Sequence, residues 1–89
     1  MLLCQVVGTV VATAKSEAFR GAKLMLVQEQ APNGSPTGSI FVATDMIGAG
    51  AGEIVLVTTG SAARAGNGHG APTDASIVAI VDAVEHNQT

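Results

Sequence analysis

LLCQVVGTVVAT, residues 2–13, is the most informative stretch of the chain for its fold. Its residues alternate with a period of two between two sets of side chains, and valine is its commonest residue. Alternation with many β-branched side chains is typical of a strand, and a run of this length predicts a long one. Gly8 stands in the middle, where a glycine marks a bulge or a tight bend. We therefore predict a long first strand that bends at Gly8.

Four more strand-like runs follow, separated by turn signals. Residues 14–22 read as a loop, and residues 31–38 hold two prolines and an Asn-Gly pair, which is a strong signal for a tight turn. Ser61 is a candidate cap for a single helical turn that runs through Arg64. The predicted strands are KLMLVQE at 23–29, SIFVA at 39–43, EIVLVTT at 53–59 and SIVAIVDAV at 76–84.

The last run is ambiguous because Ile77, Ile80, Val81 and Val84 also fit a helical stripe. Its density of Ile and Val favours a strand. Five short strands in one domain, residues 1–89, predict a compact antiparallel barrel or sandwich with at most one short helical turn. The fourth and fifth strands are apolar on both faces, whereas a half-exposed antiparallel strand should turn polar on one face. We therefore predict a subunit interface there.

The 89-residue chain is rich in small apolar residues and poor in charge. Hydrophobic residues make up 47% and charged residues 12%, with no Trp or Tyr and a net charge of -3. A domain of this size buries only about 60% of its unfolded surface, so we predict that more apolar surface is buried between subunits. Nucleic acid is not an expected partner, because phosphate binding needs clustered Lys and Arg and single strands also need aromatic platforms.

Cysteine usage and hydropathy bear on the compartment. The single cysteine, Cys4, permits no intrachain disulfide and is typical of a reducing compartment. The first 14 residues are apolar, but no positive residue precedes them and Gln5 and Gly8 interrupt the run, so we do not expect a signal peptide. No stretch approaches the ~18 continuous apolar residues of a membrane span. The expected location is the cytoplasm, without a membrane partner.

The glycine-rich run IGAGAG, residues 47–52, lies between two predicted strands and raises the question of a phosphate-binding loop. A Walker A loop needs a lysine and a hydroxyl after its last glycine, but Gly52 is followed by Glu53. The dinucleotide fingerprint fails too, because its third glycine falls on Glu53 and no crossover helix follows. We interpret the run as a turn whose glycines allow positive φ or close backbone approach, and we expect no cofactor.

Metal and nucleophile sites have little support in the sequence. Cys4, His69 and His86 lack the paired spacing of a structural zinc site, so no metal is expected. Ser61, His69 and Asp74 can be written as a catalytic triad only on paper, because short glycine loops do not hold a base or form an oxyanion hole. No catalytic residue is assigned.

Three charged residues near the glycine run each have two possible roles. Asp45 and Glu53 flank the run, so they form an acid and base pair if they share a pocket, although such residues are more often solvated turn ends. Arg64 is either an ordinary exposed arginine or a five-donor group that binds a carboxylate or carbonyl oxygens across an interface.

Three segments in this order resemble the EutN/CcmL family, the small pentamer-forming proteins of bacterial microcompartment shells. They are VVGTVVATAKSEAFRGAKLMLVQ at 6–28, TDMIGAGAGEIVLVTTGSAAR at 44–64 and PTDASIVAIVDAV at 72–84. The resemblance covers nearly the whole chain. It implies a five-stranded barrel like the oligonucleotide-binding fold, assembled as a cyclic homopentamer that closes the vertices of a polyhedral shell, without enzymatic activity.

The resemblance further implies hexameric shell proteins as partners and a place in the shell of a cytoplasmic microcompartment. The chain ends at Thr89, soon after the last predicted strand, so a C-terminal arm that wraps the neighbouring subunit is expected to be short or absent. The residues that it places at a pore on the axis or at the subunit contact are Ile47, Gly48, Ala49, Gly50, Ala51, Gly52, Glu53, Ser61 and Arg64.

The alternative function is a free-standing barrel module that binds a small ligand or an oligonucleotide. The low positive charge and the scarcity of aromatic residues argue against the oligonucleotide. Salt-dependent binding to single-stranded DNA is the observation that distinguishes this module from a shell protein.

Overall fold

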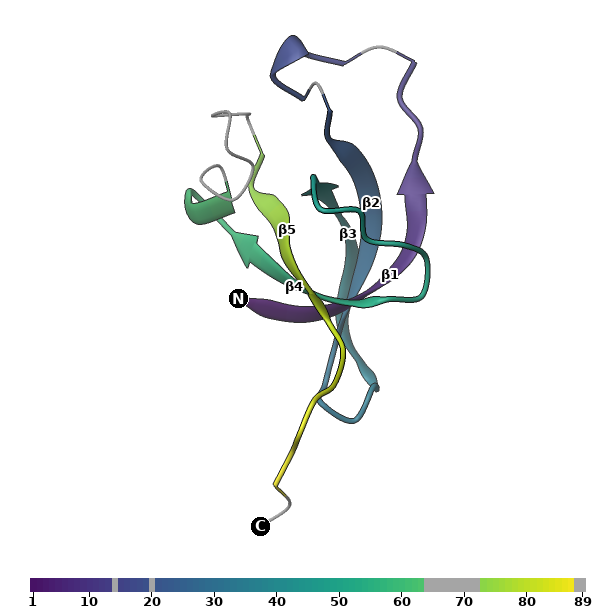
Figure 1. Ribbon diagram of the computed structural model, residues 1–89, viewed down its shortest axis with the longest axis vertical. Helices are drawn as coiled ribbons and strands as arrows, with labels where there is room; N and C mark the ends of the chain where they lie inside the picture. The colour runs from purple at the N-terminus through teal and green to yellow at the C-terminus, as the bar shows by residue number, and fades with distance from the viewer. Residues whose placement is uncertain (14, 20, 64–72, 88–89) are drawn as a thin grey trace.

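The computed structural model describes residues 1–13, 15–19, 21–63 and 73–87, and its five strands close into a barrel (Figure 1). Around the barrel the order is β1-β2-β3-β5-β4, and β4 pairs with β1 to close it. All five predicted strands are therefore present. Their bounds are β1 (Leu2–Val10), β2 (Lys23–Gln30), β3 (Pro36–Asp45), β4 (Ile54–Thr59) and β5 (Ala75–Val81).

One pair of neighbouring strands is parallel. The other four pairs are antiparallel, but β3 and β5 run in the same direction, with Thr44 beside Ser76 and Asp45 beside Ile77. The expectation of a fully antiparallel barrel was wrong at this point. The reason is topological, because directions cannot alternate all the way around a closed ring with an odd number of strands.

The predicted bend of β1 at Gly8 is confirmed. The register with β2 shifts between Val6 and Gly8, which leaves Val7 as the extra residue of a bulge. A Cβ atom at Gly8 would lie 3.2 Å from the Cδ1 atom of Leu26, so a side chain has little room there. The bulge lets one strand pair with β4 through its first half and with β2 along most of its length. The strand ends at Val10, three residues earlier than predicted.

The last element is a strand, and a bulge explains its helix-like spacing. Val57 pairs with Ile77 and Leu56 with Ala79, so β5 has one residue more than β4 between these pairs. Ile77 belongs to the buried core and Ile80 packs against it. Two side chains three positions apart therefore face the same interior, which is the spacing that also fits a helix.

Short helical turns occupy two loops. A 3-10 helix, η1 (Glu17–Phe19), lies in the segment that the sequence indicated as a plain loop. The turn predicted after Ser61 begins as expected, since Ala62 and Ala63 are helical and the Ala63 N–H donates to the Gly60 carbonyl at 3.1 Å. Arg64, its predicted last residue, lies outside the described residues.

The β2–β3 hairpin and the segment after β5 extend beyond the barrel at one end (Figure 1). The Asn-Gly turn is confirmed: Gly34 has a φ of 94°, and its N–H donates to the Ala31 carbonyl at 2.9 Å. β3 begins at Pro36, three residues earlier than predicted, where Pro36 pairs with Gln30 at the hairpin tip. Proline is tolerated there because it is the first residue of its strand.

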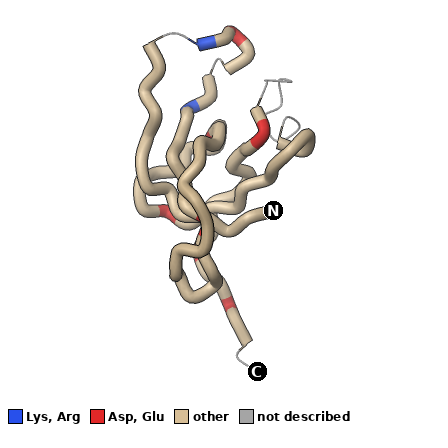
Figure 2. Tube along the Cα trace, turned by 180° about the vertical axis from the view of Figure 1, so that it is seen from behind, with Lys and Arg blue, Asp and Glu red and all other residues tan. Residues whose placement is uncertain are grey.

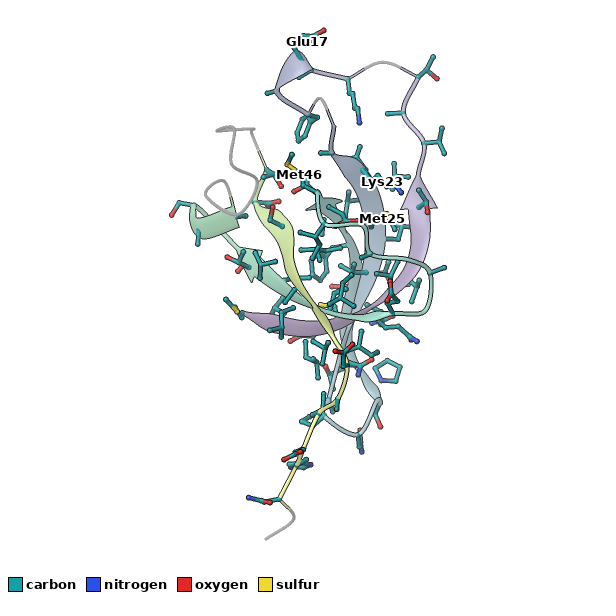
Figure 3. All side chains as sticks on the ribbon, in the orientation of Figure 1. Glu17, Lys23, Met25 and Met46 are labelled. Carbon is teal, nitrogen blue, oxygen red and sulfur yellow. The ribbon has the colours of Figure 1, made fainter. Side chains whose placement is uncertain are left out.

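Small side chains fill the barrel. Met25 lies inside it (Figure 3), and Phe41 only packs against the buried cluster. A core of this size stabilises a lone domain only marginally. The buried cluster consists of Cys4, Val6, Met25, Val27, Ala43, Ala49, Val55, Val57, Ala75 and Ile77.

Burial controls the chemistry of Cys4. The thiol is fully buried, and burial, with a smaller contribution from the charge of Glu29, raises its pKa from 9.0 to about 11. The folded chain therefore keeps a proton that the unfolded chain loses above pH 9, so stability should fall as pH rises from about 9 to about 11. Urea unfolding at several pH values measures this slope, and Cys4→Ala should remove it. If the stability of Cys4→Ala falls with pH in the same way, the buried thiol is not the cause of the pH dependence.

Candidate functional site

The glycine turn, residues 46–53, joins β3 to β4 and is held at its start by Asp45. This carboxylate is 1% exposed, and it accepts the N–H of Ile47 at 2.9 Å through Oδ1 and the N–H of Ala49 at 2.8 Å through Oδ2. Gly48 has a φ of 91°, a conformation that residues with a side chain rarely adopt. The start of the turn is thus fixed by a buried side chain and one obligatory glycine.

The end of the turn is tied to β1. The Gly52 N–H donates to the Val6 carbonyl and the Val6 N–H donates to the Glu53 carbonyl, both at 2.9 Å. The Gln5 side chain donates to the Gly52 carbonyl at 3.1 Å, and the Glu53 carboxylate accepts the Gly50 N–H at 2.5 Å. Hydrogen bonds within the chain thus fix the shape of the turn at both of its ends.

The side chains of the turn point in two directions. Ala49 is 3% exposed and belongs to the core, so its side chain packs inside the barrel rather than at a pore or a subunit contact. Asp45 pulls the Ala49 backbone inward, which is why this alanine faces the barrel. Ile47, Ala51 and Met46 are exposed, and Met46 lies near the end of the barrel where β2 begins (Figure 3). The sequence did not show that these three side chains are exposed while that of Ala49 is buried.

The two carboxylates beside the turn have structural tasks. Asp45 is buried and caps two backbone N–H groups, so the expectation of a solvated turn end was wrong for it. Glu53 is exposed, as a turn end should be, and binds a different N–H. Each carboxylate is bonded to the backbone, and the two bind at different places along the turn. Their arrangement positions a loop rather than an acid and a base.

The remaining candidate residues are scattered. Ser61 is exposed after β4 and Asp74 is exposed just before β5, while His69 lies outside the described residues. Cys4 is buried in the core, and His86 is exposed in the segment after β5. Among the described residues no three His, Cys, Asp or Glu side chains are close enough together to hold a metal ion.

Positive charge in the described part of the chain lies at one end of the barrel. Lys15 and Lys23 stand near the end where β2 begins (Figure 2), and the Lys15 ammonium donates to the Ala22 carbonyl at 2.8 Å. Acidic residues lie on η1, on β2, at the end of β3, in the glycine turn and on both sides of β5. A groove that follows a phosphate backbone needs a continuous basic surface, and the described residues do not provide one.

The outer β4 face, which consists of Leu3, Ile54, Leu56, Ala79 and Val81, is apolar. Leu3 pairs with Leu56 and Leu56 with Ala79, while Ile54 pairs with Val81, so these side chains share one side of the sheet. The inward side chains between them, Val55 and Val57, are fully buried. All members of the outer face are only half-buried. The outer sides of β4 and β5 are apolar, and the subunit interface predicted there stays a prediction. The contribution of β1 to this face was not predicted.

An open groove of about 540 Å³ separates β3 from the ends of β4 and β5. Phe41 of β3, Thr59 of β4 and Asp74 before β5 are among the residues that line it. It exists because β3 and β5 pair only at Thr44 and Asp45, so the rest of β3 diverges from β5. The sequence contains no signal for this groove, since it depends on the parallel pairing.

None of the helices in the described segments has the length and hydropathy needed to cross a lipid bilayer.

Known proteins resemble this chain over nearly its whole length. The profile of the family described as ethanolamine utilisation protein EutN/carboxysome matches residues 1–82. The microcompartment shell vertex protein GrpN of Rhodospirillum rubrum (strain F11) is 46% identical over 86 residues, covering 96% of this chain and 97% of GrpN. The carboxysome shell vertex protein CcmL of Synechocystis sp. (strain ATCC 27184 / PCC 6803 / Kazusa) is 48% identical over 85 residues, covering 94% of this chain and 85% of CcmL.

A solved structure agrees with these sequence matches. The pentameric microcompartment shell protein GrpN from Rhodospirillum rubrum superposes with a TM-score of 0.86 at 44% identity, covering 99% of this chain and all of that one (100%). The fold and the anchored turn define a small all-β barrel with an uncovered apolar outer face. The chain belongs to the EutN/CcmL family.

Proposed function

We propose that this protein is a vertex protein of a bacterial microcompartment shell, where it acts as a homopentamer in the bacterial cytoplasm. The observation that carries the proposal is the match to a pentameric shell protein along 99% of the chain, at a TM-score of 0.86. The outer β4 face supports it physically, because a small barrel with half-buried Leu, Ile and Val on its outside gains stability when identical chains cover them.

The proposed role is structural rather than catalytic. The relatives are named as shell vertex proteins, and the buried acid near the glycine turn holds backbone N–H groups. A closed shell tiled with six-fold units needs five-fold units to introduce curvature, so hexameric shell proteins are the proposed neighbours. The alternative is a free-standing module that binds a small ligand or an oligonucleotide. The oligonucleotide is less well supported, because the described residues carry no continuous basic surface.

The glycine turn is the proposed lining of the five-fold axis or of the adjoining subunit contact. Its exposed side chains and its fixed shape support this placement, whereas Ala49 is withdrawn from it because that side chain is buried in the barrel. Arg64 remains a proposal from the sequence. The residues proposed for the axis or the contact are Ile47, Gly48, Gly50, Ala51, Gly52, Glu53, Ser61 and Arg64.

The oligomer mass in solution tests the proposed function. Native mass spectrometry of the purified chain should give five times the mass of the 89-residue protomer. Co-expression with hexameric shell proteins should yield closed particles in the electron microscope, and open sheets or tubes when the vertex protein is omitted. A monomer at micromolar concentration, together with closed particles in the absence of the chain, would contradict the proposed function.

Cross-linking tests the placement of the turn. In a Cys4→Ala background, Ala51→Cys places one exposed thiol on each turn, and thiols around a narrow axis lie within reach of a short bis-maleimide. Cross-linked dimers should therefore form rapidly. Asn33→Cys, at the exposed hairpin tip, is the matched control and should form few. Equal cross-linking of the two variants in an intact ring would place the turn away from the axis.

A further inference from the structure

The tip of the β2–β3 hairpin carries an asparagine directly before a glycine. Asn33 and Gly34 lie between Gln30, the last residue of β2, and Pro36, the first of β3, and both are exposed. The hairpin extends beyond the barrel (Figure 1). An asparagine before glycine is chemically reactive, because the glycine has no side chain to hinder attack by its own backbone nitrogen on the asparagine amide. The hairpin tip therefore presents a reactive pair to water.

The turn itself requires the glycine. Gly34 has a φ of 94°, in the region that residues with a side chain rarely adopt. A Cβ atom there would have open space around it, so backbone conformation and not crowding demands glycine at this position. The geometry of the hairpin thus keeps a glycine at the position where it leaves the Asn33 amide open to attack.

The Asn33 side chain is held close to its own backbone. Its Oδ1 atom accepts the N–H of Ser35 at 2.9 Å. A bond to the N–H two residues ahead folds an asparagine side chain back over the chain, so the amide carbon Cγ lies along the segment that contains the Gly34 nitrogen. The same bond draws electron density from the carbonyl and makes Cγ a better electrophile. Electrophile and nucleophile are therefore neighbours in the folded turn.

A second hydrogen bond opposes the reaction. The Gly34 N–H donates to the Ala31 carbonyl at 2.9 Å, and the nitrogen must lose this proton before it can attack. The bond must therefore open first, which costs little at an exposed hairpin tip where water can replace it. The loss of one neutral hydrogen bond should slow the reaction roughly 2–10-fold relative to the unfolded chain.

We propose that Asn33 is a site of spontaneous deamidation in the folded chain, at a rate set by opening of the bond between Gly34 and Ala31. The Gly34 nitrogen gives its proton to a base and forms a bond to Cγ of Asn33, while the Cγ–Nδ2 bond breaks and its nitrogen takes up a proton and leaves as ammonia. Water then opens the cyclic imide at one of its two carbonyls, which gives aspartate or isoaspartate. A neutral amide becomes a carboxylate, so the net charge of the chain changes from -3 to -4.

The two products differ in their effect on the hairpin. Aspartate at position 33 keeps a side-chain oxygen that can accept the Ser35 N–H, so the turn should persist. Isoaspartate routes the backbone through the former side chain, which lengthens the loop by one carbon and removes that acceptor. The modification therefore adds negative charge at the hairpin tip, and in one of its products it also reshapes the turn. Neither effect depends on the proposed assembly.

Peptide mapping of the intact protein tests the proposal. The folded chain is kept in mildly alkaline buffer and digested with trypsin, which releases residues 24–64 as one peptide. The mass of this peptide should rise by the exchange of NH₂ for OH, and fragmentation should place the change at Asn33. The chain unfolded in guanidinium chloride should react roughly 2–10-fold faster. Asn67, which also precedes a glycine, lies outside the described residues and falls in the separate peptide 65–89.

Asn33→Gln is the matched control. It keeps a neutral amide at the same exposed position, but its longer side chain must close a larger ring that forms more slowly, so the peptide 24–64 should keep its mass. Circular dichroism verifies that each sample is folded during the incubation. A folded wild-type chain that does not react at Asn33 overturns the proposal, as does one that reacts as fast as the unfolded chain. A mass gain that persists in Asn33→Gln also overturns it, since the change then lies elsewhere in the peptide.

Discussion

Asp45→Ala is expected to destabilise the protomer by about 3 kcal/mol, because hydrogen bonds to a charged group are worth about 1.5–3 kcal/mol each and two are lost. The Ile47 and Ala49 N–H groups lose their acceptor, and the carboxylate that they bind is 1% exposed, so water has poor access to replace it. Asp45→Asn should rescue only part of the loss, because an amide has one acceptor oxygen and its NH₂ group faces the second N–H donor.

Urea unfolding at a fixed protein concentration measures this effect, since assembly contributes to the apparent stability. Glu53→Ala is the control, because that carboxylate is exposed and accepts a single N–H from Gly50. It should change the free energy of unfolding by about 1 kcal/mol or less. Equal midpoints for the wild type and Asp45→Ala would show that the turn does not depend on the buried carboxylate.

Ala49→Leu is expected to destabilise the barrel by about 1–3 kcal/mol, because it adds three carbon atoms to a packed interior. Ala49 is 3% exposed and belongs to the same cluster as Val6 and Val57. The larger side chain must displace its neighbours or pull the turn away from Asp45. Thermal unfolding should show a lower midpoint for this variant than for the wild type.

Two matched alanines distinguish overpacking from other effects. Ala12→Leu adds the same atoms at an exposed position in the loop after β1 and should leave the unfolding midpoint unchanged. Ala51→Leu adds them at the exposed side of the glycine turn, so it should alter the ring rather than the protomer. If Ala49→Leu unfolds like the wild type and weakens assembly instead, Ala49 faces a neighbouring chain and its assignment to the core is wrong.

The strands could be predicted because local rules determine them. Alternation located β1, the glycine in its middle located the bulge, and Asn-Gly located the β2–β3 turn. These signals involve residues close together in the sequence. The parallel pairing of β3 with β5 is a property of the closed ring, and the sequence of either strand contains no trace of it.

The site was harder to predict because residues of the same type in the glycine turn point their side chains in different directions. Ala49 and Ala51 have the same side chain in the same glycine-rich run, yet one is in the core and the other is exposed. The difference arises from Asp45, whose buried carboxylate holds the turn through backbone atoms. A second bulge likewise puts Ile77 and Ile80 on one side of β5, whereas simple alternation would put them on opposite sides.

The way in which the glycine turn is held has a consequence for engineering. Its shape depends on Asp45, on Gly48 and on backbone bonds to β1, whereas the side chains of Ile47 and Ala51 take no part in these bonds. The backbone shape of this loop is therefore independent of the side chains at positions 47 and 51. Charge or size can thus be changed at those two positions while the barrel keeps its fold, so they are suitable positions for variants that probe the proposed axis without unfolding the protomer.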